Sequence, residues 1–403
     1  MTAPLEGLRV LEVASWLAAP SCTALMSDMG ADVIKVEPPG GDAYRNLFAS
    51  LMGPDFVHPT YEFDNRGKRG ISLDLEQPEG RELVHDLTRD VDIFVTNLTG
   101  PRLERYELTD ENVKALAPRS VYAVLSGFGL EGPDAERQGF DQSAFWARSG
   151  AMSVSGEDGD APSLCRGGYG DHTTALNLLA AILAALRLRD QTDEGQYVEV
   201  TLQRTGIWAL AGDVTSTLYS RTQPARHSTD RPPNPLWNYY RTKDDRWLLL
   251  VMPMAMAYWP RFCELVDHPE WVEDERFQSL LGLVGNGPEI IPRIREIIAG
   301  EDLAEWGRKL DEAGLIWAPV AELTEVIDDP SLRDGGAFSM IIHPKAGAIE
   351  TISAPFEIRD ADIAVRGPAP ELGQHTREVF AELGLSRERL DELAARGVLG
   401  SVR

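Results

Sequence analysis

The sequence predicts an α/β protein with a mostly parallel, Rossmann-like large domain and a smaller α+β domain. Short β-branched runs alternate with amphipathic helical patterns, which is typical of a parallel sheet covered on both faces. A polar, proline-rich stretch at 222–235 interrupts this alternation and indicates a crossing into a second region. The length of 403 residues allows two domains.

The first region supplies most of the expected parallel sheet. Gly30 and the Pro-Pro-Gly-Gly turn at 38–41 punctuate its start, because glycine ends helices and proline closes strands. Pro78 fits the first turn of a helix. We predict strands at 8–14, 31–37, 91–96, 120–126 and 196–202, and helices at 22–29, 78–89, 110–116 and 175–188, with a further helix ending near 220.

The second region combines two short strands with several helices. The strands are expected at 236–241 and 246–252, and the helices at 256–266, 289–299 and 303–313. Strands at 338–343 and 348–352 and two amphipathic helices ending near 395 lead back to the first body. We therefore expect a discontinuous large domain of residues 1–220 and 331–403, with a small domain of residues 225–330 inserted.

Composition excludes several classes of function. The formal net charge of −25 argues against nucleic acid or an anionic membrane surface as a partner. The most apolar segment, 175–188, is shorter than the ~20 residues that span a bilayer. Three widely spaced cysteines indicate neither a disulfide framework nor a zinc site. Glu6 and Arg9 do not fit a signal peptide, so we expect a soluble cytoplasmic protein.

One aspartate stands out because three glycines precede it and an apolar helix follows. The segment runs from Gly167, Gly168 and Gly170 to Asp171, with the helix beginning directly afterwards. Asp171 is either an N-cap of that helix or a carboxylate nucleophile, since both need this placement. A helix N-terminus favours negative charge, so we expect the Asp171 pKa at or below about 3.9.

A glycine motif at 127–132 matches a dinucleotide-binding pattern, but the residues that follow it argue against such a site. Its pattern, G-x-G-x-x-G, follows a predicted strand. The next residues are polar and reach another glycine at Gly139, so no apolar helix opens at the third glycine. A pyrophosphate would therefore lack a helix N-terminus.

Taken in order, several segments resemble CoA-transferase family III, the group of formyl-CoA transferase and the carnitine and bile-acid CoA-transferases. The resemblance covers nearly the whole chain. It rests on PLEGLRVL (4–11), GADVIKVEPPGGD (30–42), NRGKR (65–69), SGFGLEGP (126–133), the Gly170-Asp171 helix, GQYVEV (195–200), YRTKD (240–244) and PAPELG (368–373).

The resemblance implies a covalent mechanism at Asp171. Its carboxylate attacks an acyl-CoA thioester to form a mixed anhydride, and the CoA thiolate returns to form an aspartyl-CoA thioester. A carboxylic acid acceptor then takes the CoA. Backbone amides of Gly168 and Gly170 are candidate oxyanion donors. CoA enters as a substrate, and neither a metal nor a permanently bound cofactor is expected.

The resemblance also implies a set of CoA contacts. Asn97 and Arg105 are the foremost of these, because amide and basic groups suit the CoA phosphates. Asp141 matches an acidic position near the nucleophile, although a helix N-cap explains it equally well. The full set is Leu17, Ala18, Arg45, Asn97, Leu98, Arg105, Gln138 and Asp141. Arg66, Lys68 and Arg69 are expected to be structural or rim charges.

The chain departs from the family pattern at two places. The loop 228–235 lacks the glycines that shield intermediates in formyl-CoA transferase, and Pro38 replaces an arginine that contacts CoA in relatives. A group of apolar residues suits a larger acyl group, or belongs to the core: Trp16, Leu17, Trp237, Met252, Met254, Met256 and Trp259.

Two alternatives remain. The 2-methylacyl-CoA racemases resemble this chain and pair the matching Asp with a His at position 140, because α-proton transfer needs a base on each face. Position 140 is Phe140, and we expect His172 to point elsewhere, so the sequence favours a transferase. The second alternative is a non-catalytic CoA-binding protein with Asp171 as a cap. The family resemblance further implies an interlocked homodimer.

Overall fold

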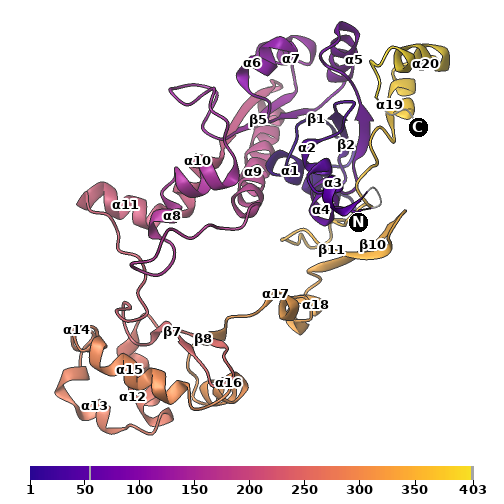
Figure 1. The fold of residues 1–403 in the computed structure, drawn as a ribbon. Coiled ribbons are helices and arrows are strands. Elements are labelled where there is room, and N and C mark those ends of the chain that lie inside the picture. The colour runs from indigo at the N-terminus through magenta and orange to yellow at the C-terminus, as the bar shows by residue number, and fades with distance from the viewer. Residues whose placement is uncertain (54–55, 401–403) are drawn as a thin grey trace. The chain divides into compact units, whose positions relative to one another are not determined.

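The computed structural model describes residues 1–53 and 56–400, which form two compact units (Figure 1). Unit 1 comprises Met1–Ala151, Leu164–Ser220 and Ser331–Arg403, and unit 2 comprises Met152–Ser163 and Arg221–Pro330. Residues 152–163, which we expected in the large domain, thus belong to unit 2. No helix in the described residues has the length and apolar character needed to cross a membrane.

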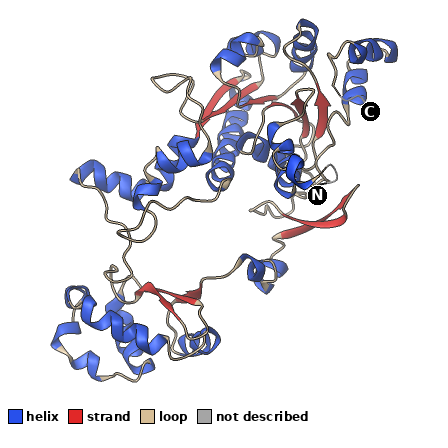
Figure 2. Ribbon diagram, in the orientation of Figure 1, coloured by secondary structure: helices blue, strands red, loops and turns tan. Residues whose placement is uncertain are grey.

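Unit 1 is built on a six-stranded parallel sheet, which confirms the predicted fold class (Figure 2). The strand order is β3-β2-β1-β4-β5-β6, and every neighbouring pair is parallel. The bounds are β1 (Arg9–Val13), β2 (Asp32–Glu37), β3 (Arg69–Ser72), β4 (Ile93–Thr96), β5 (Val121–Ser126) and β6 (Gln196–Thr201). Only β3, which is short and contains an arginine and a glycine, was not predicted.

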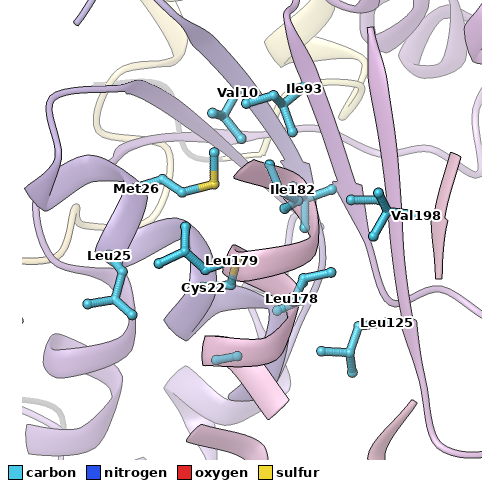
Figure 3. Close-up of a cluster of buried hydrophobic side chains, with 14 of the residues drawn as sticks. Val10, Cys22, Leu25, Met26, Ile93, Leu125, Leu178, Leu179, Ile182 and Val198 are labelled. Carbon is cyan, nitrogen blue, oxygen red and sulfur yellow. The ribbon is translucent and has the colours of Figure 1, made fainter. Parts of the chain in front are cut away.

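Side chains of the central strands alternate between two buried cores, because successive residues of a strand point to opposite faces. Val10 belongs to the first core and Leu11 to the second. The first core contains α1 (Ala18–Asp28) and α9 (Tyr169–Thr192), whose buried side chains pack together with those of the strands (Figure 3). The second contains α5 (Pro78–Thr88), α6 (Gly100–Arg105), α7 (Asp110–Leu116), α19 (Thr376–Glu382) and α20 (Arg387–Ala395).

Shorter elements complete unit 1. The hairpin β10 (Phe338–His343) and β11 (Gly347–Ile352) is antiparallel. The helix expected to end near 220 is divided into α10 (Leu202–Ala209) and α11 (Ala211–Ser220). The others are α2 (Ala43–Asn46), α3 (Ala49–Met52), α4 (Pro59–Asn65) and the π-helix η1 (Asp141–Ala147). Two helices, α8 (Ala151–Val154) and α18 (Pro330–Asp334), cross the sequence borders between the units.

Unit 2 has its own core around a three-stranded antiparallel sheet. Met252 and Trp259 are fully buried in that core, which confirms the structural interpretation for these two residues. The strands are β7 (Trp237–Arg241), β8 (Trp247–Val251) and β9 (Trp317–Pro319). The helices are α12 (Ala255–Leu265), α13 (Glu270–Glu273), η2 (Glu275–Phe277), α14 (Leu280–Gly285), α15 (Gly287–Ile298), α16 (Leu303–Glu312) and α17 (Leu323–Val326).

The strand order of unit 1 determines where a site can form. The order reverses between β1 and β4, so the loops that follow these two strands diverge at the carboxyl edge of the sheet. Ligands of open α/β sheets bind at such a point. Helix α9 leads into β6, which runs parallel to β5, so the N-terminus of α9 lies at this same edge.

A buried ionic network ties β1 and β2 to the loops at this edge. Lys35 on β2 lies 2.7 Å from Glu12 Oε1 and 3.0 Å from Asp42 Oδ2. Lys68 lies 2.7 Å from the other Glu12 oxygen, and all four side chains are fully buried or nearly so. The charges of Lys35 and Lys68 outweigh burial and lower the Glu12 pKa to about 2. The carboxylate is therefore ionised, and its pairs are true ion pairs.

We expect Lys35→Met to lower the free energy of unfolding by about 3 to 5 kcal/mol, because it leaves the Glu12 and Asp42 charges buried and uncompensated. Urea denaturation measures the loss. Arg89→Met is the control, since Arg89 pairs with Asp86 at the surface, and it should cost less than about 1 kcal/mol. Equal losses in the two variants would contradict the account of the network.

Candidate active site

Helix α9 begins at a glycine turn and carries Asp171 inside its first turn. Gly168 is the N-cap, with φ +97°, a value that glycine adopts without strain. The N–H of His172 donates to the Gly168 carbonyl at 2.8 Å, so Asp171 is the third residue of the helix. The interpretation of Asp171 as the N-cap is therefore wrong.

Asp141 holds this glycine turn through its carboxylate. The N–H of Gly168 donates to Oδ2 at 2.6 Å, and the N–H of Gly170 donates to Oδ1 at 3.2 Å. A Cβ on Gly170 would overlap Asp141 and the Phe145 ring, so only glycine fits. We expected these two N–H groups to face an oxyanion; in the structure both donate to Asp141. Phe140, not Asp141, is the N-cap of η1.

Asp171 lies in an environment that disfavours its charge. Burial, followed by the negative charge of Asp141 and then of Asp64, raises the Asp171 pKa to about 7, although the positive charge of His172 opposes the rise. The expected pKa at or below the ordinary value is therefore wrong. That expectation considered only the helix N-terminus, whereas burial and neighbouring carboxylates from distant segments dominate.

His172 is part of this environment, although we expected it to point elsewhere. Its Nε2 lies 3.0 Å from Oδ1 of Asp64, which is fully buried on α4. The Ser21 hydroxyl donates to the same Asp64 oxygen. We call Asp64, Asp141, Asp171 and His172 the acid cluster. Among the described residues, no group of His, Cys, Asp and Glu side chains is arranged to hold a metal ion.

The loop after β1 reaches the same glycine turn. A Cβ on Gly168 would lie 3.3 Å from Leu17 Cδ2, so the predicted Leu17 is in contact range of the turn. Trp16 has φ +69°, an unusual value for an aromatic residue. Asp42 accepts the Trp16 N–H at 3.2 Å and thereby supports this conformation. Ala18 is buried in the first core.

Aromatic rings extend from this loop toward Asp141. The Trp16 ring lies edge-on to Phe140 at 5.4 Å and tilted against Tyr44 at 6.1 Å, measured between ring centroids. Phe140 is 50% exposed and directly precedes Asp141. We call Trp16, Tyr44 and Phe140 the aromatic wall. The exposed Phe140 ring and the partly buried Trp16 ring offer apolar surface next to Asp141, and the buried Tyr44 packs behind Trp16.

Asn97 clamps the same loop. Its Oδ1 accepts the Ser15 N–H at 3.1 Å, and its Nδ2 donates to the Ser15 carbonyl at 2.6 Å. The predicted CoA contact thus bridges the loops after β1 and β4, where the strand order reverses. Leu98 follows it, with its N–H donating to Thr96 Oγ1 at 3.2 Å.

Both predicted arginines pair with carboxylates outside the acid cluster. Arg45 forms an ion pair with Glu37 at 2.6 Å and donates to the Tyr61 hydroxyl at 2.6 Å and the Pro370 carbonyl at 2.8 Å. Arg105 ends α6 and pairs with Glu76, while remaining 64% exposed. Gln138 lies on an exposed loop.

Arg66, Lys68 and Arg69 are structural, as expected. Arg66 is buried and lies 2.7 Å from Asp28, Lys68 belongs to the network described above, and Arg69 pairs with acidic residues of β2 and α19. Asp64, Ser21 and Tyr44 were missed by sequence analysis. Asp64 directly precedes the NRGKR segment, but a single sequence does not reveal that it faces His172.

Comparison with known proteins identifies the family of this chain. A family model for CoA-transferase family III matches residues 5–376. The chain therefore belongs to CoA-transferase family III, and it is an enzyme of that class. A solved CAIB/BAIF family protein from Brucella suis superposes with a TM-score of 0.84 at 29% identity, covering 95% of this chain and 100% of that one.

Named relatives divide by the acids in their names. The (R)-2-hydroxy-4-methylpentanoate CoA-transferase of Clostridioides difficile is 31% identical, over 96% of this chain and 97% of its own. The cinnamoyl-CoA:phenyllactate CoA-transferase of Clostridium sporogenes is 27% identical, over 96% and 95%. The succinyl-CoA:glutarate CoA-transferase of Mus musculus is 29% identical, over 98% and 90%.

We expect Asp171→Asn to stabilise the protein at neutral pH. The unfolded chain binds the Asp171 proton with a pKa near 3.9 and the folded chain with a pKa of about 7, so ionisation weakens folding as pH rises between these values. The free energy of unfolding of the variant should exceed that of the wild type by up to about 4 kcal/mol at pH 8, and by much less at pH 5.

Urea denaturation at both pH values measures this gain. Asp360→Asn, at an exposed carboxylate, serves as the control for a surface substitution and should change the free energy of unfolding by less than about 0.5 kcal/mol. A stability difference between Asp171→Asn and the wild type that is the same at pH 5 and pH 8 would contradict a raised Asp171 pKa.

Proposed function

We propose that this enzyme transfers CoA from an acyl-CoA to a carboxylic acid, with Asp171 as the covalent nucleophile. One observation supports this most: Asp171 lies at a glycine turn with a pKa of about 7, beside the loop that carries Leu17. A carboxylate with a raised pKa is more basic than an exposed one, and a basic, partly desolvated carboxylate is a better nucleophile.

The reaction balances as two exchanges at Asp171. The carboxylate attacks the thioester carbonyl, the C–S bond breaks, and a mixed anhydride and CoA thiolate form. The thiolate attacks the aspartyl carbonyl, and the donor acid leaves with one aspartyl oxygen. The acceptor carboxylate then attacks the aspartyl-CoA thioester, which releases the thiolate and forms a second mixed anhydride. The thiolate attacks the acceptor carbonyl of that anhydride and forms the new acyl-CoA. Asp171 is released as a carboxylate that keeps one oxygen of the acceptor.

The surrounding groups divide the remaining tasks. The N-terminus of α9 offers a positive dipole end to oxyanions that form at Asp171. Amides of Gly168 and Gly170 would contribute only after Asp141 releases them. Leu17 and Ala18 would approach the thioester, and Asn97, Leu98, Arg105, Arg45 and Gln138 would contact CoA. Of the two arginines, Arg105 is the more accessible to a phosphate.

The acid class that fits best is an apolar or aromatic monocarboxylate. Trp16 and Phe140 present ring faces and edges near the acid cluster. Asp64 and Asp141 would repel a second substrate carboxylate, and the nearby cations Arg45, Arg66 and Lys68 are each paired with a carboxylate. This agrees with the acids in the names of the two clostridial relatives, and not with glutarate.

Mass spectrometry of the Asp171 peptide, after incubation with an acyl-CoA and hydroxylamine, tests the mechanism. We expect a hydroxamate at Asp171, formed faster from 4-methylpentanoyl-CoA and 3-phenylpropanoyl-CoA than from glutaryl-CoA. Asp171→Ala should form none and Asp360→Asn should behave as the wild type. A folded protein left unmodified by every donor would overturn the proposal; deuterium exchange at the substrate α-carbon would then indicate a racemase, and its absence a binding protein.

We also propose a homodimer, in a reducing compartment such as the cytoplasm. In the single described chain, α11 has no buried residue, and Trp208 and Tyr219 are 77% and 88% exposed. Large exposed apolar residues on adjoining helices favour a protein partner. Within the described residues the three cysteines form no disulfide, which fits reducing conditions.

Light scattering should give twice the chain mass of 44.4 kDa, and Trp208→Glu with Tyr219→Glu should shift it toward the monomer. A monomeric wild type at micromolar concentration would contradict the dimer.

A further inference from the structure

The partly exposed His172 is hydrogen-bonded to the fully buried Asp64, next to the proposed nucleophile. His172 follows Asp171 on α9, and its Nε2 lies 3.0 Å from Asp64 Oδ1. The edge of the Phe63 ring meets the imidazole at 5.4 Å between centroids, at an interplanar angle of 86°. The ring position is therefore fixed from two sides, by a hydrogen bond and by an aromatic contact.

Asp64 needs a cation, and His172 is placed to supply it. Asp64 is fully buried, and among the described residues its Oδ2 has no hydrogen-bond partner. A buried carboxylate without compensation is costly. Lys68 is near, but its ammonium donates to Glu12, to Asn65 Oδ1 and to two backbone carbonyls, including that of Asp64 itself. The hydrogen bonds to the Asp64 side chain therefore come from the His172 ring and the Ser21 hydroxyl, both at Oδ1.

Every acidic group that faces His172 favours the imidazolium. Asp64 faces it from α4, Asp171 from its own helix and Asp141 from η1. Burial lowers the His172 pKa, but the hydrogen bond and charge of Asp64, together with the charges of Asp171 and Asp141, outweigh it and raise the pKa above its ordinary value. The Tyr44 phenol, on α2, also faces Asp64 and Asp171, and burial raises its pKa, so it stays neutral.

The charge of His172 acts directly on Asp171. Burial, Asp141 and Asp64 all disfavour the Asp171 carboxylate, whereas His172 favours it. Within the described part of the chain, His172 is the group that opposes the two neighbouring carboxylates. A neutral residue at 172 would leave Asp171 protonated over more of the neutral range, and a protonated carboxyl group does not attack a thioester.

We propose that Asp64 holds His172 as an imidazolium, and that this cation keeps Asp171 ionised for attack on the acyl-CoA. The inference rests on the proposed function for its purpose, but the ionisation of Asp171 can be tested without it. His172 is thus a positioning residue that acts through Asp171, and Asp64 acts through His172. A buried carboxylate on α4 thereby controls the reactivity of a carboxylate on α9.

Two measurements on His172→Gln test this. Glutamine keeps a donor for Asp64 but removes the charge. Carbodiimide labels protonated carboxyl groups, so the pH midpoint of Asp171 labelling, read by mass spectrometry, reports its ionisation without turnover. The midpoint should rise by about one pH unit or more in the variant. Below the midpoint, the single-turnover rate of hydroxamate formation at Asp171 should fall about tenfold for each pH unit by which the midpoint rises, and it should recover at alkaline pH.

Two further variants complete the experiment. Asp64→Asn should raise the midpoint less than His172→Gln does, because it also removes the Asp64 charge that itself disfavours the Asp171 carboxylate; it serves if His172→Gln does not fold. His268→Gln is the matched control, because His268 also lies beside a carboxylate, at 2.8 Å from Glu270, in unit 2; it should change neither midpoint nor rate.

The outcomes separate this inference from the proposed function. A midpoint unchanged in both His172→Gln and Asp64→Asn, or a rate reduced equally at every pH, would overturn the inference while leaving the transferase mechanism intact. A wild type that forms no hydroxamate with any donor, together with variants whose midpoint is higher, would overturn the proposed function and support the electrostatic role of His172.

Discussion

The carboxylate of Asp141 holds the N–H groups of Gly168 and Gly170, and the geometry of the site depends on this contact. The contact fixes the first turn of α9 and therefore the direction of Asp171. It also brings a second negative charge beside Asp171, which raises the Asp171 pKa. The Asp141 contact thus determines both the position of Asp171 and its raised pKa. Gly170 is required because any side chain there would overlap Asp141 and Phe145.

A network of buried ion pairs connects the parallel sheet to the loop that contacts this glycine turn. Glu12, Lys35 and Lys68 form ion pairs in the interior, and Lys35 extends the network to Asp42. Asp42 in turn accepts the N–H of Trp16, whose positive φ turns the loop after β1 toward α9. The network therefore connects the stability of the fold to the position of the aromatic wall. Removing one charge should disturb both.

Periodicity and turn residues predicted the fold class and the bounds of most helices and strands, because these depend on local sequence. The short β3 lacks a clear β pattern and was missed. The electrostatics could not be predicted, since Asp64, Asp141 and Asp171 come from separate segments and meet only in the folded chain. Arg45 and Asn97 matched a family pattern, but their side chains are engaged by Glu37 and Ser15.

The most direct test of the covalent role of Asp171 follows an oxygen atom. The enzyme is incubated with an acyl-CoA and an acceptor acid labelled with oxygen-18 in its carboxylate. The mass of the Asp171 peptide is then measured by mass spectrometry. Passage of CoA through Asp171 predicts that heavy oxygen accumulates in the Asp171 carboxylate with turnover and in no other residue. Formation of the new acyl-CoA with an unlabelled Asp171 would contradict a covalent role for this carboxylate.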